Sequence, residues 1–259
     1  MDLGLKSRRA LVCGASKGLG FACAHALMRE GAEVILVARG ETDLAAAAQR
    51  LEQEIGRRPE IVAADVTAEH GRQIILDRAA NCVILVNNSA GPPTGNTRDF
   101  KRQAWLDALE GNMLSAIALT NALLPAMIDA KFGRVVNISS ISIKHPQPLL
   151  ALSTGARLGL TGYMAGLARE VAADGVTVNS VLPGYFLTDR LASTLQAWAD
   201  RQSSSLDIVM AERTGSVPAR RFGKPGEFGE LCAYLCSAQA GYLTGQSIVL
   251  DGGLYPGTF

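Results

Sequence analysis

The chain has 259 residues, of which 48% are hydrophobic and 27 are glycine; this suits one large α/β domain rather than a fibrous or disordered protein. Its formal net charge is +1, so no overall field favours nucleic acid or an anionic membrane as a partner. No apolar run is expected to span a bilayer, and Met1 to Arg9 lack a signal-peptide pattern, so the sequence predicts a cytoplasmic protein.

Short apolar runs alternate with longer amphipathic segments along the whole chain. We expect strands at residues 10–13, 33–38, 61–64, 82–87, 134–139, 177–182 and 247–250. We expect helices at residues 18–30, 42–55, 101–131, 152–174 and 226–237. Several runs are apolar on both faces, which is typical of parallel strands covered by helices on both sides. The sequence therefore predicts a single domain over residues 1–259 with a Rossmann-type, doubly wound parallel sheet of about seven strands, which binds ligands at the carboxyl ends of its strands.

The five cysteines are an odd number and are scattered along the chain, which favours a reducing compartment over a disulfide framework. Cys232 and Cys236 are four residues apart and share one helix face. No histidine or aspartate cluster accompanies them, so we predict buried packing and no metal site.

A glycine-rich turn follows the first predicted strand and opens the first predicted helix. It consists of Gly14, Ala15, Ser16, Lys17, Gly18, Leu19 and Gly20. The glycines allow a tight turn and close backbone approach to a pyrophosphate. The helix N-terminus supplies free N–H groups and the positive end of a dipole. Strand, turn and helix agree, so we predict that Gly14, Ser16, Lys17, Gly18, Leu19 and Gly20 bind a dinucleotide.

Two cations favour NADP(H) over NAD(H) as that dinucleotide. The second predicted strand is followed by Arg39, where an NAD site usually carries Asp or Glu to hold the ribose hydroxyls. Lys17 lies in the glycine turn, close to the same ribose, and the pair suits a 2′-phosphate; two solvated surface charges are the alternative. Asp65, after the third strand, could accept a hydrogen bond from the adenine amino group.

These and other motifs together resemble the short-chain dehydrogenase/reductase family over nearly the whole chain, and the 3-oxoacyl-carrier-protein reductase type most. The matching segments are Gly14-xxx-Gly18-x-Gly20 after Cys13, Asp65-Val66, Asn87-Asn88-Ser89-Ala90-Gly91, Asn112, Asn137-Ile138-Ser139-Ser140, Pro183-Gly184 with Thr188, Gly245-Gln246 and Asp251-Gly252-Gly253. Cys13 replaces the usual Thr. In the segment that resembles the family's NNAG motif, either Ala90 stands where Gly is usual or one residue is inserted.

The resemblance implies hydride transfer between a nicotinamide and a small carbonyl or alcohol substrate, such as a 3-oxoacyl thioester. Ser140 would hydrogen-bond the substrate oxygen and Asn112 would order a water. Further cofactor contacts are implied at Asp65, Val66, Asn88, Ser89, Ala90, Arg157, Pro183, Gly184 and Thr188. It also implies a homo-oligomer, a dimer or tetramer.

The chain departs from the family at the tyrosine and lysine that handle the proton. Counting from Ser140, the tyrosine position holds Ser153 and the lysine position holds Arg157. The next tyrosine, Tyr163, is almost three helical turns further on. A serine hydroxyl is a far weaker acid than tyrosine. Arg157 can still hold ribose hydroxyls but cannot titrate near neutral pH.

Several alternatives stay open from the sequence. Tyr185, His145 or Lys144 could supply the missing proton, or each could be pocket wall or surface. The chain could instead be a catalytically weak dinucleotide-binding sensor or partner subunit, or a non-redox lyase or isomerase on the same scaffold.

Two segments outside the motifs carry further expectations. Glycines 155, 159, 162 and 166 follow helical spacing, which suits close packing against a partner helix or against the chain's own sheet. Residues 189–217 are expected to be the least regular stretch, and we interpret this lid segment as covering the substrate.

Overall fold

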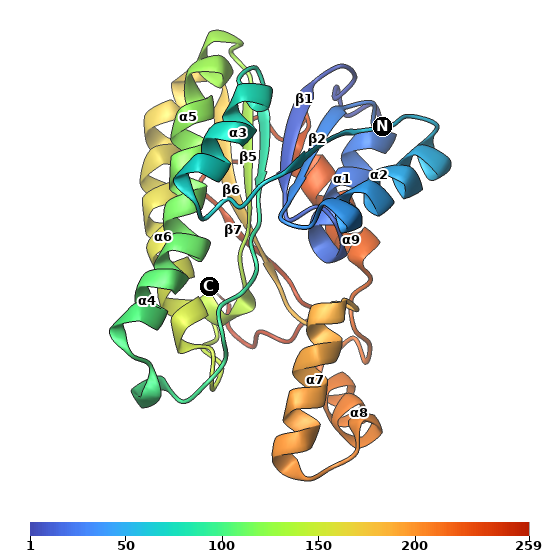
Figure 1. Cartoon of the computed structure of the whole chain (residues 1–259), viewed down its shortest axis with the longest axis vertical. Helices are drawn as coiled ribbons and strands as arrows, with labels where there is room; N and C mark the ends of the chain where they lie inside the picture. The colour runs from blue at the N-terminus through green and yellow to red at the C-terminus, as the bar shows by residue number, and fades with distance from the viewer. Residues whose placement is uncertain (259) are drawn as a thin grey trace.

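Parallel strands form the centre of the computed structural model, which describes residues 1–258 (Figure 1). They are β1 (Arg9–Cys13), β2 (Glu33–Ala38), β3 (Glu60–Ala63), β4 (Ile84–Asn87), β5 (Gly133–Ile138), β6 (Val176–Pro183) and β7 (Ser247–Leu250). Their order across the sheet is β3-β2-β1-β4-β5-β6-β7, and every pairing is parallel. The predicted doubly wound sheet of seven strands is confirmed, and its switch point lies between β1 and β4.

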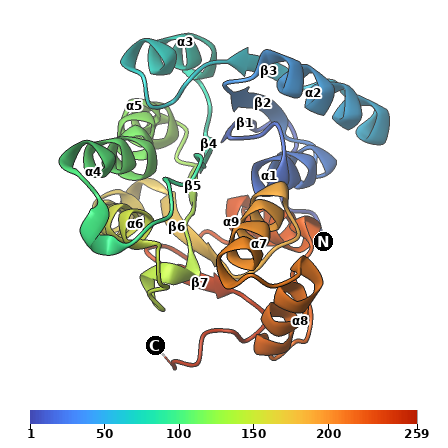
Figure 2. The same ribbon diagram turned by 60° about the horizontal axis from the view of Figure 1, so that its bottom comes forward.

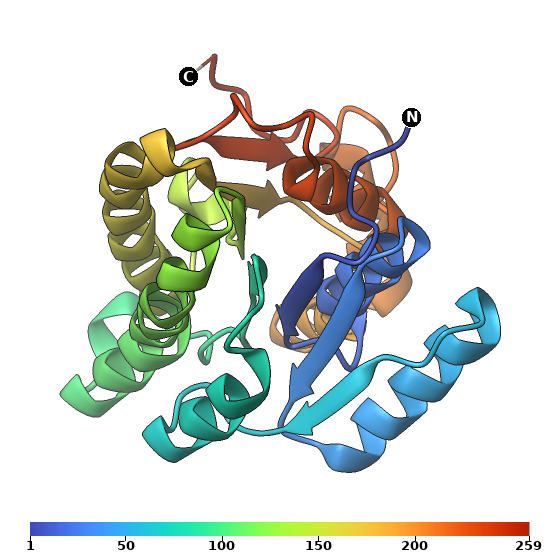
Figure 3. The ribbon, with the colours of Figure 1, turned by 90° about the horizontal axis from the view of Figure 1, so that it is seen from above.

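Helices cover both faces of this sheet, and two more project beyond it. The helices are α1 (Gly18–Arg29), α2 (Glu41–Ile55), α3 (Glu69–Ala79), α4 (Arg102–Leu109), α5 (Ser115–Asp129), α6 (Ala151–Val171), α7 (Asp189–Gln202), α8 (Leu206–Ser216) and α9 (Pro225–Cys236). One hydrophobic cluster joins α1, α2 and α9 to one face, and a second joins α3, α5 and α6 to the other (Figure 3). The apolar strands are therefore buried from both sides, as their sequence predicts.

Three elements differ from the sequence prediction. α3 was not expected, and it buries just Gly71, Ile75 and Ala79, so its apolar periodicity is weak. The expected helix at 101–131 contains a π-helical segment, Glu110–Leu114, between α4 and α5. The lid segment is helical rather than irregular, because α7 and α8 bury a third small cluster that includes Leu191 and Val209.

The α7–α8 pair stands apart from the two main layers. Both helices project from the carboxyl edge of the sheet, where the β1 turn and the loops after β4 and β5 also end (Figures 1 and 2). The fold therefore places these two helices beside the predicted ligand site.

By length and composition alone, the helix Arg102–Asp129 is long and apolar enough to cross a membrane. This corrects the expectation that no segment of the chain would meet that criterion. Its α5 part packs on the sheet through buried Leu119, Leu123 and Met127. A core helix of a soluble protein satisfies the same criterion, so this finding is weak support for a membrane span.

All five cysteines are buried with free thiols. Burial raises the pKa of the Cys13 and Cys82 thiols to about 12. Within residues 1–258, no cluster of His, Cys, Asp and Glu could hold a metal ion. Cys232 and Cys236 belong to the hydrophobic core.

The first two glycines of the α6 series pack against helices of the same chain, which differs from the expected packing on a partner helix or on the chain's own sheet. A Cβ added at Gly155 would lie 3.0 Å from the Trp105 ring, and one at Gly159 would lie 2.8 Å from the Met113 sulfur. Both glycines therefore pack against the chain's own α4 and π-helical segment. Added Cβ atoms at Gly162 and Gly166 would meet nothing within 4 Å.

Candidate functional site

The turn after β1 has the tight geometry that its glycines predict. Gly14 and Gly18 have φ of +58° and +61°, a region that favours glycine. A Cβ added at Gly20 would lie 2.2 Å from the Gly14 carbonyl oxygen. The Asn88 side chain donates to the same oxygen at 3.3 Å, which ties the turn to the loop that follows β4.

The start of α1 is open to an anionic ligand. Its N-cap, Lys17, makes no side-chain capping bond, so no side chain of the cap competes for the first N–H groups of the helix. Pro183 is the last residue of β6, and Gly184 begins the loop after it. A Cβ added at Gly18 would meet Thr188 of this loop at 3.6 Å, so Thr188 lies against the turn. These groups fit the pyrophosphate of a dinucleotide. Ser16 and Leu19 belong to the same turn and helix start.

The two cations predicted to read a 2′-phosphate are both exposed, and no direct contact joins them. Lys17 Nζ lies 3.7 Å from the Asp43 carboxylate, whereas Arg39 forms no ion pair with any described residue. Asp65 accepts hydrogen bonds from the Thr67 N–H at 2.9 Å and hydroxyl at 2.8 Å. Its carboxylate is thus held in place after β3.

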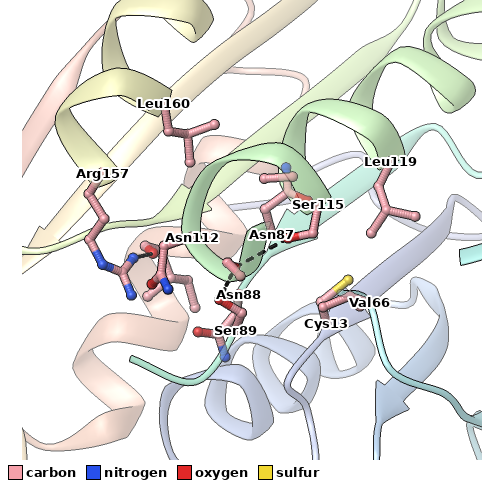
Figure 4. A pocket seen from close by; sticks show the side chains of 13 residues that line it. Cys13, Val66, Asn87, Asn88, Ser89, Asn112, Ser115, Leu119, Arg157 and Leu160 are labelled. Carbon is pink, nitrogen blue, oxygen red and sulfur yellow. Dashed lines mark hydrogen bonds between the residues drawn. The ribbon is translucent and has the colours of Figure 1, made fainter. Parts of the chain in front are cut away.

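A small cavity lies at the switch point (Figure 4). Its volume is about 20 Å³, enough for about one water molecule. The lining residues are Cys13, Val66, Asn87, Asn88, Ser89, Gly111, Asn112, Ser115, Ala116, Leu119, Ile138, Arg157 and Leu160. The structure therefore brings five predicted site residues, Val66, Asn88, Ser89, Asn112 and Arg157, to one place.

Arg157 is a buried cation in the wall of this cavity, 9% exposed. Its Nη1 group donates to the Ile138 carbonyl at 2.7 Å, and its Nε group donates to the Ser153 hydroxyl at 3.2 Å. No carboxylate of residues 1–258 pairs with it, and its Nη2 group makes no hydrogen bond there. Burial, and after it the positive charge of Arg190, lowers the pKa of the Arg157 guanidinium from 12.5 to about 10. The site thus holds one uncompensated positive charge with a donor to spare.

Asn112 lies opposite Arg157 in the π-helical segment (Figure 4). Its Nδ2 group is 3.4 Å from the Ala90 carbonyl, and its buried Oδ1 atom has no partner. The Ser89 hydroxyl donates to the Gly111 carbonyl, which fixes the loop after β4 to the same segment. π-Helical turns recur at functional sites, and here the turn leaves an acceptor facing the cavity.

Ser140 follows β5 and caps a short 3-10 turn. Its hydroxyl oxygen accepts from the Ser142 N–H at 3.1 Å, so its own proton remains available to donate. Ser140 and Ser153 are partly buried but lie outside the cavity lining. Arg157 links the two regions, because it bonds both Ser153 and the last residue of β5.

Tyr185 and His145, two candidates to replace the missing proton donor, lie in different surroundings. The Tyr185 ring packs edge-on against Trp198 and Phe222, with ring centroids 6.3 and 6.0 Å apart, in the α7–α8 cluster. His145 is exposed after the turn that Ser140 caps. Within residues 1–258, neither side chain forms a hydrogen bond with Ser140 or Arg157.

Sequence reasoning missed Arg190, in the first turn of α7. Its Nη2 group is 3.4 Å from the Pro92 carbonyl, and its charge acts on Arg157. The one sequence signal was its place directly after the Pro183–Thr188 motif. The contact across to the loop after β4 depends on tertiary structure.

A glycine turn, a switch-point cavity and polar groups on the carboxyl edge define a Rossmann-type dinucleotide-binding fold. A family model described as enoyl-(acyl carrier protein) reductase matches residues 14–255. The 3-oxoacyl-[acyl-carrier-protein] reductase FabG of Vibrio cholerae is 34% identical, and the alignment covers 98% of this chain and 99% of the relative. The chain therefore belongs to the short-chain dehydrogenase/reductase family.

Solved structures of reductases are also similar to this chain along nearly its whole length. L-sorbose reductase from Gluconobacter frateurii, in complex with NADPH and L-sorbose, is 27% identical with a TM-score of 0.93, covering 98% of each chain. A variant of actinorhodin polyketide ketoreductase with NADPH is 32% identical with a TM-score of 0.89, covering 96% of this chain and 97% of that one.

Proposed function

We propose that this chain is an NADP(H)-dependent oxidoreductase that catalyses the reduction of a carbonyl substrate or the oxidation of the matching alcohol. In its catalytic centre, Ser153 and Arg157 replace the family's tyrosine and lysine. Relatives named as 3-oxoacyl reductases and ketoreductases support the reaction class. Structural neighbours that carry NADPH or NADP support the cofactor. A 3-oxoacyl thioester is one candidate substrate.

The observation that carries this proposal is the buried, uncompensated Arg157 guanidinium beside the switch-point cavity. A cation that is already desolvated stabilises negative charge that develops on a carbonyl oxygen, because the protein need not reorganise during the reaction. The Ser140 hydroxyl accepts from the Ser142 N–H, so in this proposal its own proton is left to donate a second hydrogen bond to that oxygen. A bound nicotinamide supplies the hydride, while the glycine turn, Asp65, Asn88 and Thr188 hold the dinucleotide.

The proton reaches the product oxygen through water in this proposal. Arg157 does not titrate near neutral pH, and Ser153 already accepts a bond from it. The unpaired Asn112 Oδ1 faces a cavity of about one water's volume, so it can hold the water that passes a proton inward.

The cofactor preference is tested at the two exposed cations. Replacing both Lys17 and Arg39 with alanine should weaken NADPH binding by about 10- to 100-fold, because each charge-assisted bond to the 2′-phosphate is lost. NADH binding should change by less than about threefold, since NADH lacks that phosphate. Fluorescence titration of both nucleotides measures this, and an equal loss for the two would contradict the assignment.

The pH dependence of turnover should follow Arg157. The pKa of its guanidinium lies at about 10, so the protonated form is fully present below that pH and is lost as the pH rises through it. We expect kcat to stay flat from neutral pH to about 9 and to fall near 10. A steady-state pH profile checks this. A fall near neutral pH would indicate that a group other than Arg157 controls turnover.

A cytoplasmic homo-oligomer, small-molecule substrates and a lid role for α7–α8 complete the proposal. The open Gly162 and Gly166 face of α6, next to Leu158 at 47% exposure, suits close packing by a second copy. Sedimentation of the purified chain tests the oligomer, and a monomer at micromolar concentration would contradict it.

A dinucleotide sensor or partner subunit is the second candidate, because the proton-handling tyrosine is absent. Titration with NADPH and NADH, followed by NADPH oxidation with a panel of ketones, aldehydes and a 3-oxoacyl thioester, separates the two. Tight NADPH binding with turnover supports the reductase, and tight binding without turnover supports the sensor.

A further inference from the structure

A second hollow lies between the loop that follows β4 and the helix α7. The cleft has a volume of about 340 Å³, within the size range of small-molecule pockets. Its lining residues are Pro93, Thr94, Arg190, Ser193, Thr194, Ala197, Trp198 and Arg201. The switch-point cavity has no lining residue in common with it.

The cleft is lined by one face of α7. The lining residues of this helix recur every three or four positions from Arg190 to Arg201, which is helical spacing. The opposite face carries buried Leu191, Leu195 and Ala199, which join the third hydrophobic cluster. Burial of that apolar face fixes the rotation of α7, so both arginines are held toward the cleft.

The cleft is positively charged without a counter-charge. Arg190 and Arg201 are the charged members of its lining, and neither forms an ion pair with any residue in 1–258. Arg190 donates to the Pro92 carbonyl at 3.4 Å through Nη2 alone. Its remaining N–H groups are free to bind a ligand.

The cleft and the candidate site adjoin at Arg190. A Cβ added at Gly91 would lie 3.3 Å from the Arg190 guanidinium, and Gly91 follows directly on the residues that bond Asn112 and the glycine turn. The charge of Arg190 also acts on Arg157. Two cations with no carboxylate between them repel each other, and an anion bound at Arg190 would relieve that repulsion.

We propose that the substrate carries, besides its carbonyl or alcohol group, an anionic carboxylate or phosphate that Arg190 and Arg201 bind in this cleft. The carbonyl half of this proposal rests on the proposed reductase function. Guanidinium groups match both anions through paired N–H donors. The Trp198 ring gives the connecting part of the substrate an apolar wall, and the Thr94 hydroxyl adds a hydrogen-bonding group.

The test uses matched pairs of ketones that differ in charge. One pair is 4-oxopentanoate and 4-oxopentanamide, and the other is dihydroxyacetone phosphate and dihydroxyacetone. Calorimetric titration of the full chain saturated with NADP⁺ measures the dissociation constant of each, because the oxidised cofactor cannot reduce them. We expect the anionic member of at least one pair to bind about 10- to 100-fold more tightly. The pair that shows the preference tells carboxylate from phosphate.

Variants then assign the preference to the arginines. Arg190→Gln and Arg201→Gln should each reduce it, and the double variant should abolish it, while Arg190→Lys should keep part of it. Arg58→Gln removes another exposed charge, which lies just after α2 and pairs with Glu52, and should leave the preference unchanged. NADPH affinity should be unchanged in Arg190→Gln.

The outcomes separate this proposal from the reductase proposal. Equal binding of the charged and neutral members, or a preference that survives the double variant, overturns the anion site. A loss of NADPH affinity in Arg190→Gln would place that arginine on the cofactor and overturn it as well. An arginine-dependent preference without any NADPH oxidation would retain the anion site and contradict the reductase.

Discussion

Arg157→Met is expected to lower kcat by about 10²- to 10³-fold, the cost of losing one donor to a developing oxyanion, while leaving the fold at least as stable. The second expectation follows from burial. The pKa of the guanidinium is lowered from 12.5 to about 10, which corresponds to a cost on the order of 3 kcal/mol for keeping it charged in the folded state.

The free-energy cost of the buried charge depends on pH. The unfolded chain holds this proton up to a higher pH than the folded chain does. The cost is therefore fully present below about pH 10 and disappears as the pH rises toward 12.5. At neutral pH, the Arg157→Met substitution removes this cost, but it also removes the two hydrogen bonds to Ile138 and Ser153.

Thermal unfolding at neutral pH measures the balance. We expect the Tm of Arg157→Met to stay within about 3 °C of the wild type or to exceed it. Arg157→Lys is the matched control, since it keeps the charge, and it should retain most of the turnover. A Tm that falls by more than about 5 °C would mean that Arg157 serves mainly to hold the β5–α6 packing.

Gly20→Ala is expected to weaken NADPH binding by at least about 100-fold, because the added methyl would lie 2.2 Å from the Gly14 carbonyl oxygen. That contact is with the backbone, so the turn must shift, and its N–H groups are then no longer positioned to bind the pyrophosphate. Overpacking of this kind also costs about 1–3 kcal/mol of stability. Calorimetric titration with NADPH measures the affinity, and thermal unfolding measures the stability.

Gly226→Ala is the control for that variant. It adds the same methyl in the first turn of α9, where nothing lies within 4 Å, and should stabilise the helix by up to about 1 kcal/mol without changing NADPH affinity. Gly18→Ala, whose methyl would meet only Thr188 at 3.6 Å, tests the turn if Gly20→Ala does not fold. An NADPH affinity for the folded variants close to that of the wild type would remove the turn from the binding site.

Most of the fold could be predicted from local sequence patterns. Buried strands such as β2 and β4 are largely apolar, and the glycine turn after β1 needs positive φ at Gly14 and Gly18. These signals are contained in a few neighbouring residues, so the sheet and the turn were predictable. α3 was missed because its buried face is narrow, and the α7–α8 pair was missed because polar residues surround a small cluster.

The candidate site was predictable where residues are close in sequence. Ser153 and Arg157 are four apart on one helix, and their hydrogen bond follows from that spacing. The unpaired Asn112 Oδ1 depends on a π-helical turn that the sequence does not signal. The approach of Arg190 to Pro92 joins the first turn of α7 to the loop after β4, far apart in the chain, so only the folded structure reveals it.

The most direct test of a working centre without tyrosine and lysine compares the wild type with the double variant Ser153→Tyr/Arg157→Lys, by following NADPH oxidation over one carbonyl panel. We predict that the wild type binds NADPH tightly and turns over at least one member of the panel, and that the variant gains no more than about tenfold in rate. Tight NADPH binding by a wild type that turns over nothing, with reduction appearing only in the double variant, would contradict the reductase function and favour a dinucleotide sensor.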